Sequence, residues 1–371
     1  MVRYEFQLAT REDDAQLRAI LAATPMRGRI AVSFRREPSF FDAAVVDGAF
    51  HQVVICRDQQ QHRIAGFGCR SVRDRFVNGR PTPVGYLSSL RVLPDYRPLG
   101  LLARGYAYFR RLHSDQKAQI YLTTIAEDND RALSTLTTGR AGLPDYAFAG
   151  RYHTVVIPIP RRRHRVTSCV ALQVREATAL DRDCLIAFLQ EVGPARQFFP
   201  CLRAADFFEE KSTFRDLAPG DLLLAFRDGR LVGTLGSWDQ RGFRQSVVES
   251  YDRVLGWLRP FYNAWAAITG RPRLVRVGEP LRCLTAAIPT VLENDAAVFA
   301  TLLDALLVRA SAGPADYLLV GLHETDPLLP VAQRRAADSY VTRVYLVSWE
   351  DGRSFRDALD DRPRYLELGF L

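Results

Sequence analysis

The chain has 371 residues, of which 47% are hydrophobic and 25% are charged, and its formal net charge is +8. This composition is typical of a soluble globular protein with two or three domains. No apolar run is long enough to cross a membrane and the N-terminus lacks the shape of a signal peptide, so we expect a cytoplasmic protein without a membrane partner. The six cysteines lack C-x-x-C pairs, which argues against a zinc site or a disulfide framework, and we expect no metal.

The positive charge comes almost entirely from arginine, because Lys117 and Lys211 are the two lysines among 50 basic residues. This bias is more typical of a G+C-rich genome than of selection for one ligand. A basic protein nevertheless favours anionic partners, such as CoA with its phosphates or nucleic acid. The densest basic run, Arg161 to Arg165, lies between two proline-flanked strands, and we interpret it as a solvated linker.

The first predicted elements alternate between strands and helices. Residues Tyr4 to Ala9 alternate as a strand, and Thr10 to Asp14 form a helix N-terminus with acidic residues in the first turn. A short strand, a proline and a second helix follow between residues 29 and 46. Residues His51 to Arg57 and Arg63 to Arg73 then predict two paired strands joined by a polar turn.

The segment from Val84 to His113 predicts a strand that leads directly into a helix. Small and apolar residues suit a strand as far as the turn at Pro94-Asp95. From Leu99 the apolar residues recur with helical spacing, and Pro98 suits the first helical turn. Such a junction leaves backbone amides unpaired beside the positive end of the helix dipole, a geometry that binds phosphate. Gly100 would let a ligand approach the main chain closely.

Two short motifs in this region resemble those of a known family. Arg97-Pro98-Leu99-Gly100-Leu101-Leu102 resembles the pyrophosphate loop Q/R-x-x-G-x-G/A of the GNAT acyl-CoA N-acyltransferase superfamily, with Leu102 in place of the usual glycine or alanine. After a further strand, Asn129-Asp130-Arg131-Ala132 is similar to the family's N-x-x-A at the start of the next helix. The alternative is an ordinary strand, turn and helix with a glycine in the turn.

The resemblance implies direct transfer of an acyl group from CoA to an amine that is held in the same cleft. It implies that the acyl-CoA is bound by residues of the strand, the loop and the two following helices, namely Leu90, Val92, Arg97, Leu99, Gly100, Leu101, Leu102 and Asn129. It also implies an acceptor side of the cleft that includes Phe34, Arg35, Arg36, Phe40 and Phe41. A core aromatic pair with solvated arginines is the alternative reading of that second group.

The motifs do not fix a general acid or base. The central strand has no carboxylate where many members of the family have a glutamate, and Leu136 stands where their acid tyrosine is usual. The candidates that remain are Tyr86, Glu127 and Tyr146, with Asp128 and Tyr152 as nearby substitutes. For each of them an ordinary core tyrosine or a helix-capping acid is the alternative interpretation.

A similar order of elements begins again near residue 169, where VREATALDRDCLIAFL resembles the earlier FQLATREDDAQLRAIL. The second copy departs from the family at the phosphate loop, where Leu292 to Ala297 contain no arginine-glycine pattern and two acids. Because these acids would repel pyrophosphate, we expect no CoA binding there. A long segment, Phe243 to Pro280, also carries four aromatic residues on a predicted helix, Trp257, Phe261, Tyr262 and Trp265.

The predicted fold class is α/β (α+β), with two tandem GNAT-like domains that each have a mixed, mostly antiparallel sheet flanked by helices. The predicted parts are residues 1–160 with the acyl-CoA loop, a basic linker at 161–168, residues 169–350 without the loop, and an unplaced tail at 351–371. The second domain is expected to shape the acceptor site or to make a homodimer contact.

The predicted function is transfer of an acetyl group from acetyl-CoA to the amine of a small molecule, in the N-terminal domain. Two alternatives stay open. One is a catalytically silent CoA-binding or scaffold protein. The other is an RNA- or tRNA-associated transferase, which ranks last because the sequence has no ladder of basic and aromatic residues.

Overall fold

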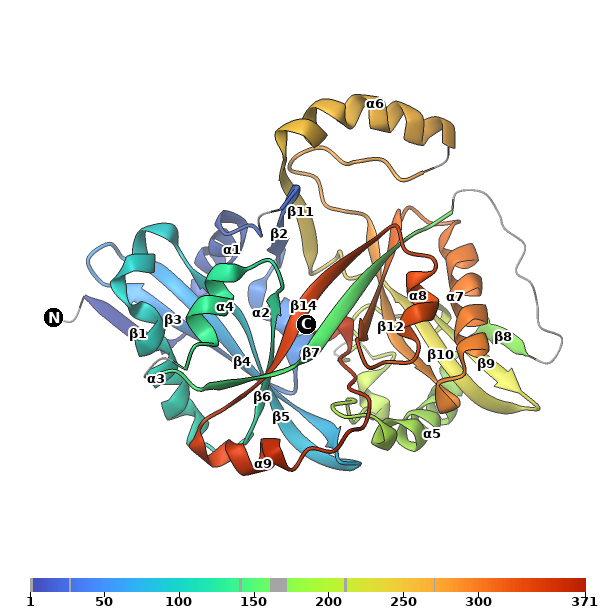
Figure 1. Cartoon of the computed structure of the whole chain (residues 1–371), viewed down its shortest axis with the longest axis horizontal. Coiled ribbons are helices and arrows are strands. Elements are labelled where there is room, and N and C mark those ends of the chain that lie inside the picture. Colours follow the sequence, from blue (N-terminus) through green and yellow to red (C-terminus); the bar gives the residue numbers. More distant parts are fainter. Residues whose placement is uncertain (1–2, 27, 140–141, 161–171, 210–211, 270) are drawn as a thin grey trace.

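The computed structural model describes residues 3–26, 28–139, 142–160, 172–209, 212–269 and 271–371 (Figure 1). We call residues 3–160 the N-terminal half and residues 172–371 the C-terminal half. The strands of the N-terminal half are β1 (Tyr4–Leu8), β2 (Ile30–Arg35), β3 (Phe50–Asp58), β4 (Arg63–Val77), β5 (Arg80–Val92), β6 (Tyr121–Ala126) and β7 (Asp145–Pro158). Its α-helices are α1 (Asp14–Ala23), α2 (Phe40–Ala43), α3 (Leu101–His113) and α4 (Asp130–Leu136).

The C-terminal half has a similar order of elements. Its strands are β8 (Gln173–Glu176), β9 (Leu222–Arg227), β10 (Arg230–Trp238), β11 (Gln245–Tyr251), β12 (Cys283–Val291), β13 (Tyr317–His323) and β14 (Asp338–Ser348). Its α-helices are α5 (Arg182–Val192), α6 (Arg253–Thr269), α7 (Ala296–Ala310), α8 (Leu329–Gln333) and α9 (Arg353–Asp357). From the sequence we predict a helix at about Ala204 to Phe214, and this prediction is wrong, because the described part of that segment has only the 3-10 turn Ala204–Asp206.

The first helix of each half begins in the same way. In the N-terminal half the backbone amide of Thr10 donates to the Asp13 carboxylate at 3.0 Å, and in the C-terminal half the amide of Thr178 donates to Asp181 at 2.8 Å. Each carboxylate satisfies an amide just outside the helix and lies at the positive end of the dipole. The repeated Ala-Thr motif of the sequence therefore marks a repeated helix start.

Twelve strands form one continuous sheet in the order β1-β3-β4-β5-β6-β14-β7-β13-β12-β10-β9-β8. The pairs β5–β6 and β12–β13 are parallel and the other neighbours are antiparallel. The predicted class, a mixed and mostly antiparallel sheet flanked by helices, is confirmed. The halves do not have separate sheets, however, because each contributes its last strand to the other half.

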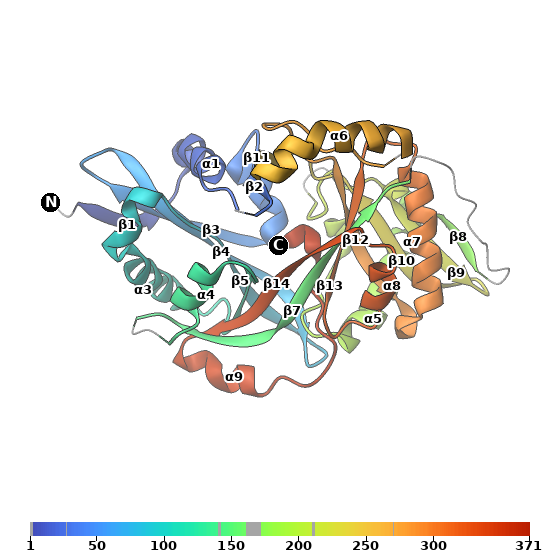
Figure 2. The same ribbon diagram turned by 45° about the horizontal axis from the view of Figure 1, so that its top comes forward.

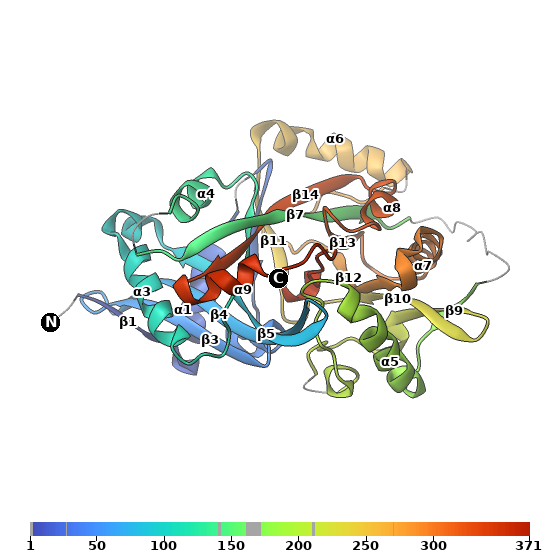
Figure 3. The ribbon, with the colours of Figure 1, turned by 60° about the horizontal axis from the view of Figure 1, so that its bottom comes forward.

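The exchange involves β7 and β14, which lie side by side across the centre of the molecule (Figures 1 and 3). Strand β14 pairs with β6 of the N-terminal half, β7 pairs with β13 of the C-terminal half, and β7 and β14 pair with each other. The last strand of each half therefore lies against the opposite half. Local sequence patterns predict that a strand exists, whereas its partners depend on contacts between residues that are distant in the chain.

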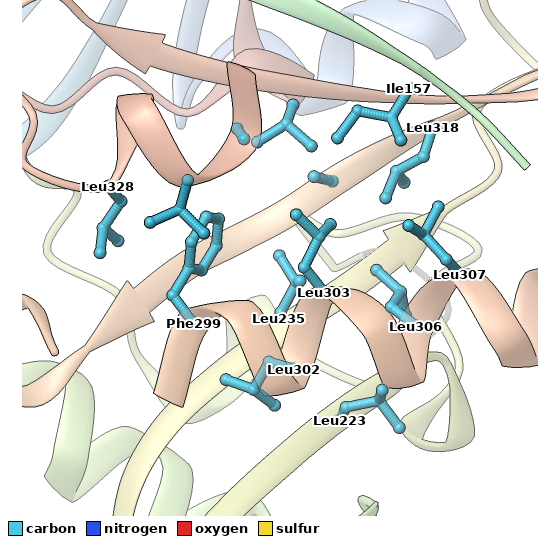
Figure 4. Packing of buried hydrophobic residues seen from close by; sticks show 14 of the residues in the cluster. Ile157, Leu223, Leu235, Phe299, Leu302, Leu303, Leu306, Leu307, Leu318 and Leu328 are labelled. Carbon is cyan, nitrogen blue, oxygen red and sulfur yellow. The ribbon is translucent and has the colours of Figure 1, made fainter. Parts of the chain in front are cut away.

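Core packing follows the exchange. Ile157 of β7 packs among leucines of the C-terminal half, including Leu307 of α7 and Leu318 of β13 (Figure 4). In return, Tyr345 and Val347 of β14 are buried with residues of α3 in the N-terminal half. Each half thus has apolar side chains of the other in its own core, and the hydrophobic free energy of both halves is shared.

Helices cover both faces of the N-terminal part of the sheet. Val53 and Ile55 of β3 pack against α1, whereas their neighbour Val54 packs on the side of α3. Because successive side chains of a strand point to opposite faces, α1 and α3 lie on opposite sides of the sheet. We call these the α1 face and the α3 face.

A second, two-stranded sheet joins the halves at another place, where β2 pairs with β11. The tail that the sequence left unplaced also packs between the halves, since Leu366 and Phe370 are buried in two different core clusters. The predicted linker at 161–168 lies outside the described residues, and the division at residue 160 stays a prediction.

We expect residues 1–160 and 169–371, produced as two separate chains, to be unstable on their own. Each would lack the strand that covers its sheet edge and part of its core, and unpaired edges promote aggregation. Circular dichroism and thermal melting of each fragment, and of the two co-expressed, would measure this. Cooperative melting of either isolated fragment near the melting temperature of the full chain would contradict the interdependence of the halves.

Candidate functional site

The site begins where two parallel strands part. Strands β5 and β6 are paired only at Gly85 with Tyr121 and at Tyr86 with Leu122. A side chain at Gly85 could not fit, because its Cβ would lie 2.0 Å from the Tyr121 ring. Beyond these pairs β5 continues along β4 and β6 continues along β14, so a wedge opens between them. The edge of β5 that faces the wedge therefore lacks a strand partner.

A bulge lies in β5 inside the wedge. Its register with β4 shifts between Phe67 and Cys69, and Ser89 has a φ of 54°. Such a bulge bends a strand and changes the direction of its backbone groups. Leu90 and Val92 follow directly. The Arg91 guanidinium donates to the Leu90 carbonyl and Arg97 Nε donates to the Val92 carbonyl, each at 3.1 Å, so the Arg97 side chain contacts the strand end.

Helix α3 starts at the open end of β5. A 3-10 turn (Pro94–Leu99) leads from the strand to Gly100, whose φ of 64° and ψ of 20° are left-handed and favour glycine. The first turn of α3 contains no acidic residue, and its amides have no partner within the helix. The strand, turn and helix junction is thus present, and its binding of an anion stays a prediction. Among the described atoms none would lie within 4 Å of a Cβ at Gly100, apart from those of the adjoining residues, so the described structure leaves space for a ligand there.

Four of the predicted acyl-CoA residues surround one apolar cavity of about 30 Å³ between the strands and α3. They are Leu90 and Val92 of β5 and Leu101 and Leu102 of α3. Asn129 is placed elsewhere, where its side chain accepts from the Ala132 amide at 3.2 Å and caps α4. The side chain of Leu99 lies outside the described part of the structure.

The three predicted catalytic residues do not come together. Tyr86 is buried on the α1 face among residues such as Leu346, and its hydroxyl lies 2.9 Å from Thr124 Oγ1. Tyr146 lies on the α3 face, where its hydroxyl shares a hydrogen bond with Tyr106. Burial raises the pKa of both Tyr86 and Tyr146, so each phenol stays protonated at neutral pH.

Glu127 lies at the end of β6 and is paired with arginines. It accepts from Arg151 Nε at 2.8 Å and lies 3.4 Å from Arg343 Nε. The hydrogen bond from Arg151 lowers the pKa of this carboxyl group. Both arginines line a cavity of about 350 Å³ together with Tyr146. Tyr146 thus lines this cavity beside the two arginines that pair with Glu127, while Tyr86 lies across the sheet.

Sequence reasoning missed a buried charged cluster on the α1 face. Asp47 accepts from Arg36 at 2.9 Å, lies 3.2 Å from His51 Nε2, and is bound by Arg244 of the C-terminal half. Although burial alone would raise it, the two guanidinium groups hold the pKa of Asp47 well below its usual range. Arg36, which the resemblance placed on the acceptor side, is therefore a buried ion-pair partner. Its neighbour Phe34 is 46% exposed.

Two further buried arginines, Arg73 and Arg75, lie on the same face of β4. Their guanidinium groups donate to the carbonyls of Val46 and Phe198, both at 3.1 Å, and burial lowers the pKa of each arginine to about 10. The sequence did contain a signal. Arg73 and Arg75 are two positions apart on one strand, a spacing that places both side chains on the same face, here the face of Tyr86.

The equivalent wedge of the C-terminal half is filled by the chain itself. Strands β12 and β13 also part after a short parallel pairing, and Ile288, with a φ of 50°, is the bulge. Pro289 then takes the place of Leu90 and offers no N–H. The Ile288 amide donates to Glu367 at 3.1 Å, so the C-terminal segment occupies this wedge.

The N-terminus of α7, the helix that follows β12, is also occupied by a side chain of the protein itself. The Asp295 carboxylate accepts from the amides of Ala297 and Val298 at 2.9 and 3.2 Å, and it pairs with Arg227 at 2.9 Å. A side-chain anion thus occupies the position that a pyrophosphate would need. This geometry supports the expectation that the C-terminal half does not bind CoA.

We expect His51 to make the stability of the protein depend on pH. Burial lowers the pKa of His51, but the Asp47 carboxylate outweighs that effect and raises it to about 9 from 6.5. Because the folded pKa is the higher one, this stabilisation is fully present below pH 6.5 and is lost as the pH rises through 9. The free energy of unfolding can be measured with urea at both ends of this pH window. Between them it should fall by about 1 to 3 kcal/mol more in the wild type than in His51→Gln. Equal losses in the two proteins would contradict the role of His51.

No family model matches the sequence, and no curated protein matches it. A GCN5-related N-acetyltransferase from Sphaerobacter thermophilus has a similar structure, with a TM-score of 0.54 at 10% identity over 100% of this chain and 99% of that one. N-myristoyltransferase of Saccharomyces cerevisiae with bound myristoyl-CoA gives a TM-score of 0.58 at 11% identity over 94% and 79%. A GCN5-related N-acetyltransferase from Anabaena variabilis gives 0.50 at 11% identity over 93% and 72%. These structural neighbours are acyltransferases, and the chain has their GNAT fold.

Proposed function

We propose that the protein is an acyl-CoA-dependent N-acyltransferase that transfers an acetyl group from acetyl-CoA to the amine of a small molecule. One observation carries this proposal. The wedge between β5 and β6, which ends at the acid-free N-terminus of α3, is open in the N-terminal half, whereas its counterpart is filled by Pro289, Asp295 and Glu367. A chain of this fold that keeps one of two such wedges open has one site for an acyl-CoA.

The proposed binding mode uses backbone groups more than side chains. The edge of β5 at Leu90 and Val92 would hold the pantetheine arm, and the first amides of α3 would hold the pyrophosphate. The thioester would then lie at the closed end of the wedge, near Tyr86. The amine nitrogen attacks the thioester carbon, the carbon–sulfur bond breaks, and the CoA thiolate leaves with a proton. Positioning both reactants in one cleft supplies much of the rate enhancement.

Tyr86 is the proposed proton donor to the thiolate. It is the last β5 residue paired with β6, so its side chain lies where the wedge closes, on the face opposite α3. Burial raises its pKa, which keeps the proton on the phenol until the thiolate forms. Tyr146 is bonded to Tyr106, and Glu127 is paired with arginines, so neither is placed as well for this role.

A catalytically silent CoA-binding protein is the second candidate. Strand β5 has no carboxylate, which favours this candidate. The buried Asp47 is paired with Arg36 and Arg244, and this pairing makes its carboxylate a weak base. This candidate predicts the same binding site. Only a measurement of turnover distinguishes this candidate from the enzyme.

We expect Gly100→Glu to weaken binding of acetyl-CoA by about a hundredfold or more, because a carboxylate would lie beside the helix amides. Calorimetric titration with acetyl-CoA and with free CoA would measure affinity and stoichiometry, with one site per chain expected. The matched control is Gly229→Glu in the β9–β10 turn, where φ is 76° and a Cβ also has no atom within 4 Å. A non-glycine residue in the left-handed conformation destabilises both variants by a similar amount, about 1 to 2 kcal/mol. Equal affinities of the Gly100→Glu and Gly229→Glu variants for acetyl-CoA would contradict the assignment of the loop at Gly100 as the pyrophosphate site.

We expect Tyr86→Phe to lower kcat for acetyl transfer by about a hundredfold while leaving the affinity for acetyl-CoA unchanged. Because the variant has no phenol to titrate, its kcat should also fall less at alkaline pH than the kcat of the wild type. Tyr146→Phe, on the other face of the sheet, is the comparison variant and should change kcat by less than about threefold. A larger loss of kcat in Tyr146→Phe than in Tyr86→Phe would assign the role of proton donor to Tyr146. Binding without turnover by the wild type, over a panel of amines, would favour the silent protein.

A further inference from the structure

Residues 253–278, which we call the arm, project from the C-terminal half. The arm consists of α6 and the segment that returns from it to β12, and it lies apart from the main sheet (Figures 1 and 2). The returning segment is fixed to one side of the helix. Asn263 exchanges hydrogen bonds with the backbone of Leu274 at 3.0 and 2.8 Å, and the Tyr262 hydroxyl donates to the Pro272 carbonyl at 3.3 Å.

The opposite side of α6 is apolar and open to solvent. Six large side chains are between 41% and 80% exposed, namely Val254, Trp257, Leu258, Phe261, Trp265 and Ile268. At 3.6 residues per turn these positions fall within a stripe about 100° wide, the width of a helix face that normally packs on a core. Scattered apolar residues on a surface need no explanation, but a contiguous stripe of this kind marks an interaction surface.

The charge around the stripe is predominantly positive, and the nearest acids in the sequence, Asp252 and Glu279, flank the arm and accept from backbone amides of Leu255 and Arg276. The arm contains five arginines, Arg253, Arg259, Arg271, Arg273 and Arg276, and no acidic residue, in a chain that has 42 Asp and Glu residues. Arg271 lies over the Trp265 ring at 4.7 Å, directly beside the stripe. Within the described residues, Arg253, Arg271, Arg273 and Arg276 are exposed and none of them makes an ion pair.

We propose that the arm binds the surface of an anionic lipid bilayer, with the apolar stripe inserted among the headgroups and the arginines against lipid phosphates. Tryptophan and phenylalanine on one face, flanked by basic residues, are the composition of helices that lie in the membrane interface. A second copy of the chain fits the same surface poorly. Two arms face to face would bring ten arginines together, with acids only at the flanking positions Asp252 and Glu279.

This proposal differs from the expectation that the protein has no membrane partner, which rested on the lack of a spanning segment. No helix in the described residues is long and apolar enough to cross a membrane. An interfacial helix does not need to cross, because it buries one face only. The proposal is also independent of the acyl-CoA site, since the arm contains none of its residues.

Co-sedimentation with vesicles tests the proposal directly. We expect the protein to bind vesicles of phosphatidylcholine with a third phosphatidylglycerol at least about tenfold more tightly than vesicles of phosphatidylcholine alone, and added salt to weaken that binding. Trp238 and Trp349 are buried, so a blue shift of tryptophan emission would report on Trp257 and Trp265. Brominated lipids should quench this emission in the wild type, a measurement that needs no variant.

The variant for this test is the double substitution Trp257→Glu and Phe261→Glu, which should reduce binding to anionic vesicles by about tenfold or more. The matched control is Leu180→Glu, since Leu180 is 94% exposed on another part of the molecule. Thermal melting would confirm that both variants are folded. Unchanged vesicle binding by the double variant, or no quenching in the wild type, would overturn the proposal. So would self-association without lipid that the double variant abolishes, because it would show that a second copy covers the stripe.

Discussion

The pairing of β7 with β14 is the constraint on which the rest of the molecule depends. Each strand comes from one half and pairs with the other, and the two pair together along ten residue positions at the centre of the sheet. The consequence for the site is direct. Strand β6 is held to β14 at six positions but to β5 at only two, so the wedge in the N-terminal half is kept open by a strand of the C-terminal half. The C-terminal half is therefore part of the site's framework even if it binds nothing itself.

The two halves show how little chemistry separates an open wedge from a closed one. Both have a short parallel pairing, a bulge with a positive φ and a helix that follows. In the C-terminal half a proline removes one backbone donor, an aspartate takes two helix amides, and a glutamate of the C-terminal segment takes the amide at the bulge. That glutamate is fully buried, and burial raises the pKa of Glu367 to about 7, so a negative charge there is costly. The closed wedge is thus held by neutral or self-paired groups, with no room for a phosphate.

The sequence predicted the elements better than their partners. Periodicity and turn residues located α1, β5, α3 and α6, whereas the left-handed conformation of Gly100 was not predicted. The strand exchange could not be predicted, because β7 and β14 have the same pattern of alternation whichever neighbour they take. The same limit explains why Tyr86 and Tyr146 were grouped: the face on which a strand side chain lies depends on register and on bulges, which short-range patterns do not determine. The burial of Arg73 and Arg75 could not be predicted for the same reason.

The arginine excess has two different physical meanings in this one chain. In the body of the protein many arginines are paired with carboxylates, as in Arg36–Asp47, Arg196–Asp326 and Arg70–Asp115, so their charge stabilises the internal structure. In the arm the described arginines have no such partners. The base of the arm is also fixed, because β11 pairs with β2 of the N-terminal half and Glu249 accepts from Arg35 at 2.7 Å. Within a chain that is rich in arginine throughout, the arm is therefore a local concentration of exposed arginines without ion-pair partners among the described residues.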